Sequence, residues 1–77
     1  MISVTVEFKG YLKQYTGHRE PLSLELQQDT QVEAVFTHFN IPAHLIKLVS
    51  IDGTMVEKTQ LLKDGDHIVI QPVVLGG

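Results

Sequence analysis

The clearest helix signal in the 77 residues is the segment Thr30-Gln31-Val32-Glu33-Ala34-Val35-Phe36-Thr37-His38-Phe39. Its apolar positions recur at the spacing of one helix face and predict a single buried stripe of Val32, Val35, Phe36 and Phe39. Thr30 and Glu33 have the spacing of a capping box, which predicts that Thr30 is the N-cap of the helix. Asn40 and Pro42 predict that the helix ends shortly after Phe39.

Two alternating segments precede this helix and predict half-buried strands. Residues 2–8 and residues 22–27 each place an apolar side chain at every second position. We expect these two strands to pair antiparallel. Between them, residues 11–17 form either a helical turn or a loop over the edge of the core, and residues 17–21 are polar turn material.

Three further strands are predicted after the helix. Residues 45–51 are apolar enough for a strand, Asp52-Gly53 is a strong tight-turn pair, and residues 55–56 fit a short return strand. Residues 67–74 form the last strand. The order strand-strand-helix-strand-strand-strand indicates an α+β fold, with a mixed four- or five-stranded sheet packed on one main helix.

The composition sets limits on function. A chain of 77 residues makes one domain and cannot both enclose a deep pocket and keep a packed interior, which favours a carrier, a binding module or a subunit over a self-sufficient enzyme. A net charge of −3, with six scattered Lys and Arg residues, argues against nucleic-acid binding and against anionic membranes. Without cysteine there is no disulfide, thiolate metal site or cysteine nucleophile. The sequence shows no signal peptide and no apolar run of membrane-spanning length, so the cytoplasm is the expected compartment.

The remaining polar candidates are best explained as surface residues. None of the four histidines has the spacing of metal ligands, so we expect no metal site at His18, His38, His44 or His67. Asp64 and Asp66 flank a glycine and are expected turn residues, because the twelve-residue calcium pattern is absent. The polar positions of the two N-terminal strands should form an open, solvated sheet face on which a partner could dock, made of Thr5, Glu7, Glu25 and Gln27.

Four segments carry a resemblance to a known family. Ile51-Asp52-Gly53 stands where that family often has an Asn-Gly turn, and the segment from Leu62 to Ile70 and the terminal Pro72-Val73-Val74-Leu75-Gly76-Gly77 are its other specific parts. The early Phe8-Lys9-Gly10-Tyr11-Leu12 looks like the family's aromatic-then-leucine start, with Lys13 where an arginine is common. On these residues the whole chain resembles the ThiS and MoaD group of ubiquitin-like sulfur carriers, which have the β-grasp fold. Val73 and Leu75 stand where MoaD-like chains often have a second proline and an alanine.

The resemblance implies a site at the C-terminus and no catalytic residues in this chain. An E1-like enzyme, using ATP and magnesium, would adenylate the carboxylate of Gly77, and sulfur would then convert it to a thiocarboxylate. Residues 73–77 would be a flexible tail that enters a partner's active site, with Gly76 passing a narrow channel and Val73, Val74 and Leu75 docking. No cofactor would be bound. The sulfur acceptor would be an enzyme such as the molybdopterin synthase large subunit or thiazole synthase, in molybdopterin or thiamine biosynthesis.

Two other hypotheses stay open. The chain could be a ubiquitin-like protein modifier that forms an isopeptide bond through Gly77, since the activation step would be the same. It could also be a non-catalytic β-grasp interaction module with an incidental glycine end.

Overall fold

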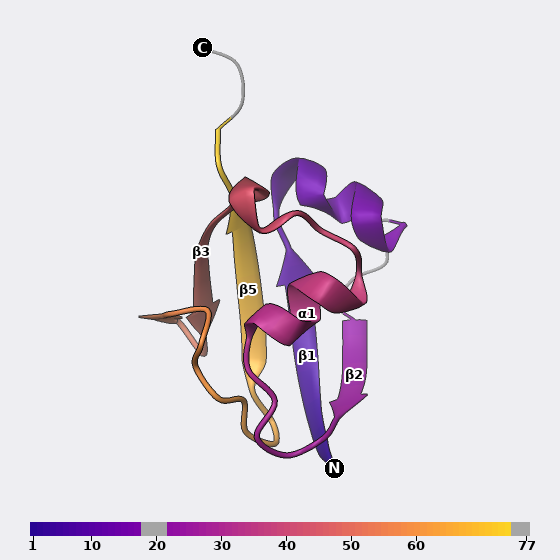
Figure 1. Ribbon diagram of the computed structural model, residues 1–77, viewed down its shortest axis with the longest axis vertical. Coiled ribbons are helices and arrows are strands. Elements are labelled where there is room, and N and C mark those ends of the chain that lie inside the picture. Colours follow the sequence, from indigo (N-terminus) through magenta and orange to yellow (C-terminus); the bar gives the residue numbers. More distant parts are fainter. Residues whose placement is uncertain (18–21, 75–77) are drawn as a thin grey trace.

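The computed structural model describes residues 1–17 and 22–74, which form a five-stranded sheet with one α-helix against one face (Figure 1). The helices are α1 (Glu33–His38) and two 3-10 helices, η1 (Gly10–Thr16) and η2 (Ala43–Leu45). The strands are β1 (Ile2–Phe8), β2 (Leu22–Leu26), β3 (Ile46–Ile51), β4 (Thr54–Val56) and β5 (His67–Pro72). The sheet order is β2-β1-β5-β3-β4, with β1 and β5 parallel and the other pairs antiparallel. This confirms the predicted mixed sheet of a ubiquitin-like β-grasp fold.

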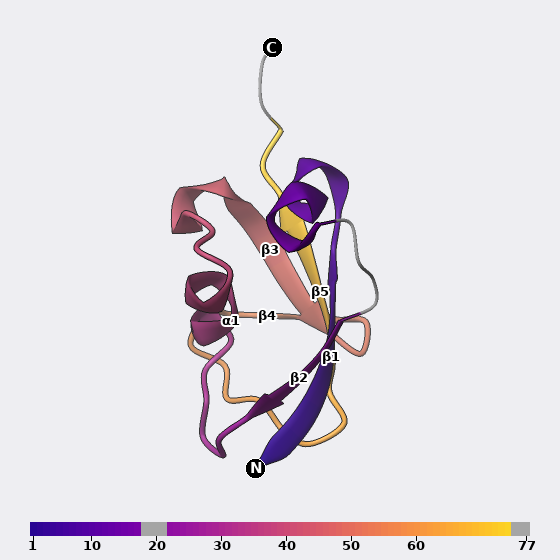
Figure 2. The same cartoon turned by 90° about the vertical axis from the view of Figure 1, so that its right-hand side faces the viewer.

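The first and last strands lie side by side in the middle of the sheet and supply much of the core. Their register sets Val6 opposite Ile68 and Phe8 opposite Ile70, and all four side chains are fully buried. Side chains of a strand alternate between its faces, so these buried residues share one face of the sheet. Figure 2 shows from the side that α1 lies against one face of the sheet. The predicted helix stripe is confirmed: Val32, Val35 and Phe36 are buried, and Phe39 packs against this core with its ring centroid 5.4 Å from that of Phe8.

The start of the helix differs from the prediction. The predicted capping box at Thr30 and Glu33 is wrong, because α1 begins at Glu33 and the Thr30 hydroxyl donates to the Gln27 carbonyl instead. The amides that a cap would satisfy are taken by main-chain carbonyls of a distant loop. The Val32 amide donates to the Gln60 carbonyl at 2.9 Å, and the Glu33 amide donates to the Lys58 carbonyl at 3.0 Å. A backbone cap supplied by tertiary structure therefore replaces the side-chain cap.

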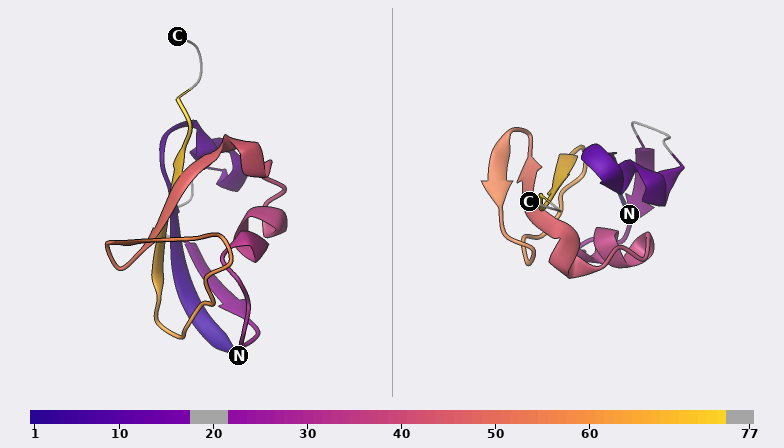
Figure 3. Two further views of the ribbon diagram at one scale, coloured as in Figure 1. Left: turned by 60° about the vertical axis from the view of Figure 1, so that its left-hand side comes forward. Right: turned by 90° about the horizontal axis from the view of Figure 1, so that it is seen from above.

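The other end of the helix follows the prediction. Asn40 has the left-handed backbone (φ 58°) typical of a residue just past a helix. The Ile41 amide then donates to the Phe36 carbonyl at 2.9 Å, which satisfies an acceptor of the last turn. The chain turns away here, and η2 carries it to β3 at the end of the sheet, as both views of Figure 3 show.

The predicted connections are confirmed where they are described. Residues 10–16 are helical rather than a loop, and Asp52-Gly53 joins β3 to β4 with both residues at positive φ (50° and 87°), as a two-residue hairpin turn requires. The last strand ends at Pro72, two residues earlier than predicted. The predicted turn at residues 18–21 lies outside the described residues.

Candidate functional site

The C-terminal end of β5 is the place from which a functional tail would leave the fold. Figure 1 shows that β5 runs between β1 and β3 toward the end of the molecule where η1 and η2 lie, opposite the N-terminus. At that end Ile46 is paired with Pro72, and the Lys9 amide donates to the Ile70 carbonyl at 2.9 Å. The end of the strand is therefore held from both sides, by the chain after β1 and by the start of β3.

Val73 is attached to the folded body by two hydrogen bonds. Its amide donates to the Leu45 carbonyl at 2.9 Å, and its carbonyl accepts from the Tyr11 hydroxyl at 2.6 Å. Val73 is accordingly half-buried, whereas Val74 is 86% exposed. We call the residues that hold Val73 and the end of β5 before it, namely Lys9, Gly10, Tyr11, Leu45 and Ile46, the tail exit.

Gly10 shapes the tail exit through its missing side chain. Its φ of +56° is one that L side chains rarely adopt, and a Cβ at this position would lie 3.3 Å from Pro72 Cγ. The glycine therefore allows η1 to begin directly against the end of β5, which places Tyr11 within reach of Val73.

The predicted tail residues are only partly described. Val73 belongs to the folded body and Val74 projects from it, while Leu75, Gly76 and Gly77 lie outside the described residues. The predicted roles of these five residues remain a proposal, taken up below.

The sheet face opposite α1 carries three of the four polar residues predicted there. The strand alternation that buries Val4 and Val6 turns Thr5 and Glu7 outward, and Glu25 is exposed on β2. The Thr5 hydroxyl lies 2.8 Å from His67 Nδ1. The prediction for Gln27 is wrong, because β2 ends at Leu26 and Gln27 lines a groove beside the helix.

An ion pair on this face lowers the pKa of one carboxyl group. Lys9 Nζ lies 3.0 Å from Glu7 Oε2, and its hydrogen bond lowers the pKa of the Glu7 carboxyl below the ordinary 4.5. The positive charges of Lys9, His67 and Lys13 act on the pKa in the same direction, and partial desolvation opposes them.

The outward face also holds a row of side chains, two of them apolar, that the sequence patterns did not reveal. Ser50 is paired with Val69 on one side and with Met55 on the other, so these three side chains form a row across β5, β3 and β4. Met55 is 70% exposed. The sequence indicates only that Ser50 points away from the core, because it follows the buried Val49 in a strand. The cross-strand register was needed to show that Val69, Ser50 and Met55 are neighbours.

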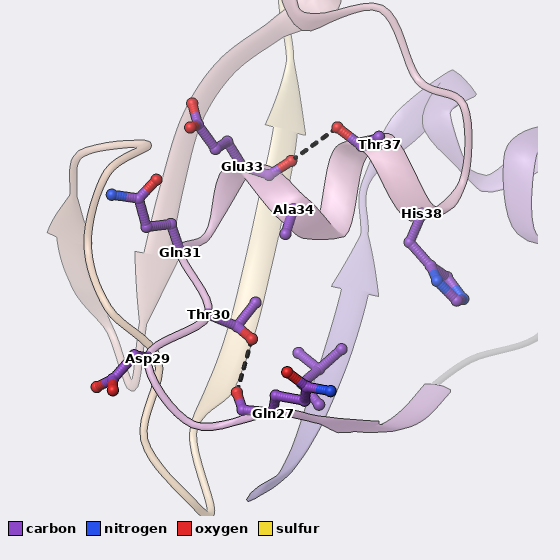
Figure 4. A pocket seen from close by; sticks show the side chains of 9 residues that line it. Gln27, Asp29, Thr30, Gln31, Glu33, Ala34, Thr37 and His38 are labelled. Atoms are coloured by element: carbon purple, nitrogen blue, oxygen red, sulfur yellow. Dashed lines mark hydrogen bonds between the residues drawn. The ribbon is translucent and has the colours of Figure 1, made fainter. Parts of the chain in front are cut away.

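A shallow groove lies on the helix side of the sheet, near the end of β2 (Figure 4). Two internal hydrogen bonds shape it, from the Thr30 hydroxyl to the Gln27 carbonyl and from the Thr37 hydroxyl to the Glu33 carbonyl. Its lining is mixed, with Leu26 and Ala34 beside Asp29, and it includes no residue of the tail exit. It takes no part in the site at the end of β5.

The histidines do not form a metal site in the part of the chain that the structure describes, where no group of three or more His, Cys, Asp or Glu residues could hold an ion. His38, His44 and His67 are exposed on three different elements, and the His38 ring packs edge-on against Phe39 with centroids 4.8 Å apart. His18 lies outside the described residues. Within residues 1–17 and 22–74, no helix is long and apolar enough to cross a membrane.

Comparisons with known proteins agree on one family and one fold. The sequence profile of the ThiS family matches residues 6–77. Among solved structures, a Pyrococcus furiosus protein described as molybdopterin converting factor, subunit 1, superposes with a TM-score of 0.76 at 18% identity, covering 96% of this chain and 100% of its own. No curated protein sequence matches this chain.

Two further structures have protein-modifier names. SAMP1 of Haloferax volcanii, the small archaeal modifier protein 1, superposes with a TM-score of 0.73 at 18% identity, covering 97% of this chain and 99% of its own. The ubiquitin of Caldiarchaeum subterraneum gives 0.65 at 20% identity, covering 99% and 98%. At these identities the likeness shows a shared fold.

Proposed function

The chain belongs to the ThiS family, and from that premise we propose that it is a sulfur carrier whose reactive group is the C-terminal carboxylate of Gly77. The observation that carries the proposal is the extent of the family match, which runs through the tail to residue 77. The exposure of Val74, directly after the anchored Val73, supports it, because the residues that follow are not needed to complete the sheet.

The proposed chemistry begins with activation, because a carboxylate is a poor electrophile. In the active site of an E1-like enzyme, the Gly77 carboxylate attacks the α-phosphate of Mg-ATP and pyrophosphate leaves. Hydrosulfide, HS⁻, then attacks the acyl carbon of the adenylate, AMP leaves as the C–O bond breaks, and loss of the proton from sulfur gives the thiocarboxylate. Gly76 and Gly77 have no Cβ, so the tail passes a narrow channel and adopts backbone angles that other residues avoid.

The partners follow from this chemistry. One is the E1-like adenylating enzyme, and the other is a sulfur acceptor such as the molybdopterin synthase large subunit or thiazole synthase. The reaction would take place in the cytoplasm. Leu75 and Val74 would be buried in the groove of each partner, and full burial of such a side chain stabilises a complex by roughly 1.5–3 kcal/mol.

Intact mass spectrometry after co-expression with an E1-like enzyme tests the proposal. A mass increment that corresponds to replacement of one oxygen by sulfur, located on the C-terminal peptide, is the expected result. A variant lacking Gly77 is the matched control and should keep its unmodified mass. If the full chain forms no adenylate and keeps its mass in the presence of ATP and the enzyme, the proposal fails.

A protein-modifier role is the second candidate, favoured by the structural likeness to SAMP1 and to an archaeal ubiquitin. Gly77 would then form an isopeptide bond with a lysine of a target protein. Immunoblots of cells that express a tagged chain would show a ladder of larger species that disappears when Gly77 is deleted. An unchanged single band would count against this role.

A further inference from the structure

The anchored Val73 limits how far the reactive carboxylate can reach. Four residues separate it from the C-terminus, and a fully extended chain spans at most about 3.3–3.6 Å per residue, hence roughly 14 Å in all. If Gly77 is adenylated as proposed above, the activating enzyme must bring its catalytic centre within this distance of the tail exit. The surface around the tail exit is therefore covered by the partner during activation.

Two lysines lie close in the chain to residues of the tail exit, one in η1 and one at the start of β3. Lys13 follows Tyr11 by two positions in η1, and Lys47 follows Leu45 by two positions at the start of β3. Tyr11 and Leu45 are the two residues that hydrogen-bond Val73. Because two residues span at most about 7 Å, the backbone of each lysine lies close to one of these anchors.

A β-bulge sets the position of Lys47. The pairing of β3 with β5 shifts between Ile46 and Leu48, and Lys47 is the extra residue in this irregularity. A bulge re-aims a side chain that would otherwise follow the regular alternation of the strand. The Lys47 side chain is exposed.

Charge is unevenly distributed over the described residues. The charged side chains on the chain around the tail exit are Lys9, Lys13, Lys47 and Glu7. The others lie on β2, α1, the connection between them, the hairpin turn and the loop before β5. They are Glu25, Asp29, Glu33, Asp52, Glu57, Lys58, Lys63, Asp64 and Asp66. Among the described residues, the chain around the tail exit thus carries three lysines and one glutamate, although the net charge of all 77 residues is −3.

We propose that the tail exit with Lys13 and Lys47 is a docking surface for an acidic face of the activating enzyme. This rests on the proposed function, since it names the partner surface for the same activation step. Opposite charges on two such faces accelerate encounter and orient the two proteins, and the short tail needs that orientation to enter the active site. The acidic remainder of the chain is then directed away from the enzyme by repulsion.

Steady-state adenylation kinetics with charge-reversed variants test the docking surface. The variants are Lys47→Glu and Lys13→Glu, and the matched controls are Lys58→Glu and Lys63→Glu, which change the net charge equally in the loop before β5. The E1-like enzyme of the source organism is titrated with each variant, and pyrophosphate release is followed at low and high salt. Thermal unfolding of every variant shows that it is folded.

We expect Lys47→Glu and Lys13→Glu each to raise the KM for the carrier on the order of tenfold at low salt, with kcat retained and the KM for ATP unchanged. High salt should reduce this difference, because it screens exposed charges. The two control variants should change the KM for the carrier less than about twofold.

Three results would overturn the docking surface while leaving the proposed function intact. These are equal effects in all four variants, no effect in any of them, or a raised KM for ATP, which would point to the nucleotide phosphates as the occupant. Failure of the unaltered chain to be adenylated is a different outcome, because it overturns the proposed function itself.

Discussion

Tyr11 and Gly10 are the residues that decide how the last strand leaves the fold. The tyrosine hydroxyl holds the Val73 carbonyl at 2.6 Å, and the glycine leaves room for Pro72. Both residues position the end of the last strand, and neither is proposed to take part in the reaction. Their effects can be measured separately, because one removes a hydrogen bond and the other adds a methyl group.

Replacement of Tyr11 by Phe should loosen the tail exit. The loss of one hydrogen bond to a part-buried carbonyl should lower the free energy of unfolding by about 1 kcal/mol. Amide hydrogen exchange gives the local readout: the Val73 amide should exchange faster relative to the Val6 amide in the core strand. Unchanged exchange at Val73 would show that the hydroxyl does not hold the tail.

Gly10→Ala should destabilise the chain more than Gly17→Ala. Both glycines have positive φ, +56° and +67°, so each alanine carries the left-handed penalty of roughly 1 kcal/mol. Only at Gly10 does the new Cβ come as close as 3.3 Å to Pro72 Cγ, whereas nothing lies within 4 Å at Gly17. We expect a total loss of about 2 kcal/mol at Gly10 by urea denaturation. Equal losses of unfolding free energy in the two variants would mean that the Pro72 ring moves aside without destabilising the fold.

Glu7 should contribute a pH-dependent part of the stability. Its pKa is lowered in the folded chain by the hydrogen bond from Lys9 and returns to about 4.5 on unfolding. A carboxyl of this kind stabilises the fold above pH 4.5, and the contribution is lost as the pH falls through the lower folded pKa. Glu7→Gln should therefore flatten the decline of unfolding free energy below pH 4.5, and Lys9→Met should do the same. A decline as steep as in the unaltered chain would contradict this.

The helix α1 depends on a loop that is remote in sequence. With six residues it is too short to be stable alone, and the Lys58 and Gln60 carbonyls accept from the amides at its start. Leu62, 4% exposed, fixes the same loop to the core. Thr30 and Glu33 have the spacing of a capping box, but no side chain caps the start of α1.

Glu33→Ala should therefore cost less than about 0.5 kcal/mol, as expected for an exposed side chain without a capping bond. Leu62→Ala, by contrast, should cost about 2–5 kcal/mol, because it leaves a cavity beneath the capping loop. Thermal unfolding of both variants gives the comparison. A loss near 1 kcal/mol or more at Glu33 would restore the capping box.

In the whole molecule, the segment that completes the fold and the segment that is proposed to react follow one another along the chain. The last strand fills the middle of the sheet and ends at Pro72, so the core is complete before the proposed reactive residue is reached. Stability and activation should thus respond to different parts of the chain.

Deletion of Gly77 should leave the thermal unfolding midpoint nearly unchanged and abolish adenylation. The described core does not include this residue, and the proposed chemistry requires its carboxylate. Calorimetry and the pyrophosphate assay measure the two effects on one sample. A collapse of the fold on deletion would mean that the tail is structural.

The strands, the helix stripe, the Asp52-Gly53 turn and the fold could be predicted from the sequence, because they depend on spacing and turn chemistry among near neighbours. Features that depend on the pairing of distant segments could not be predicted in this way. The register of β5, β3 and β4 places Val69, Ser50 and Met55 side by side. The main-chain carbonyls of the loop before β5 cap the start of α1. In the same way, Tyr11 and Leu45 hold Val73, so that the proposed tail begins at Val74 instead of Val73.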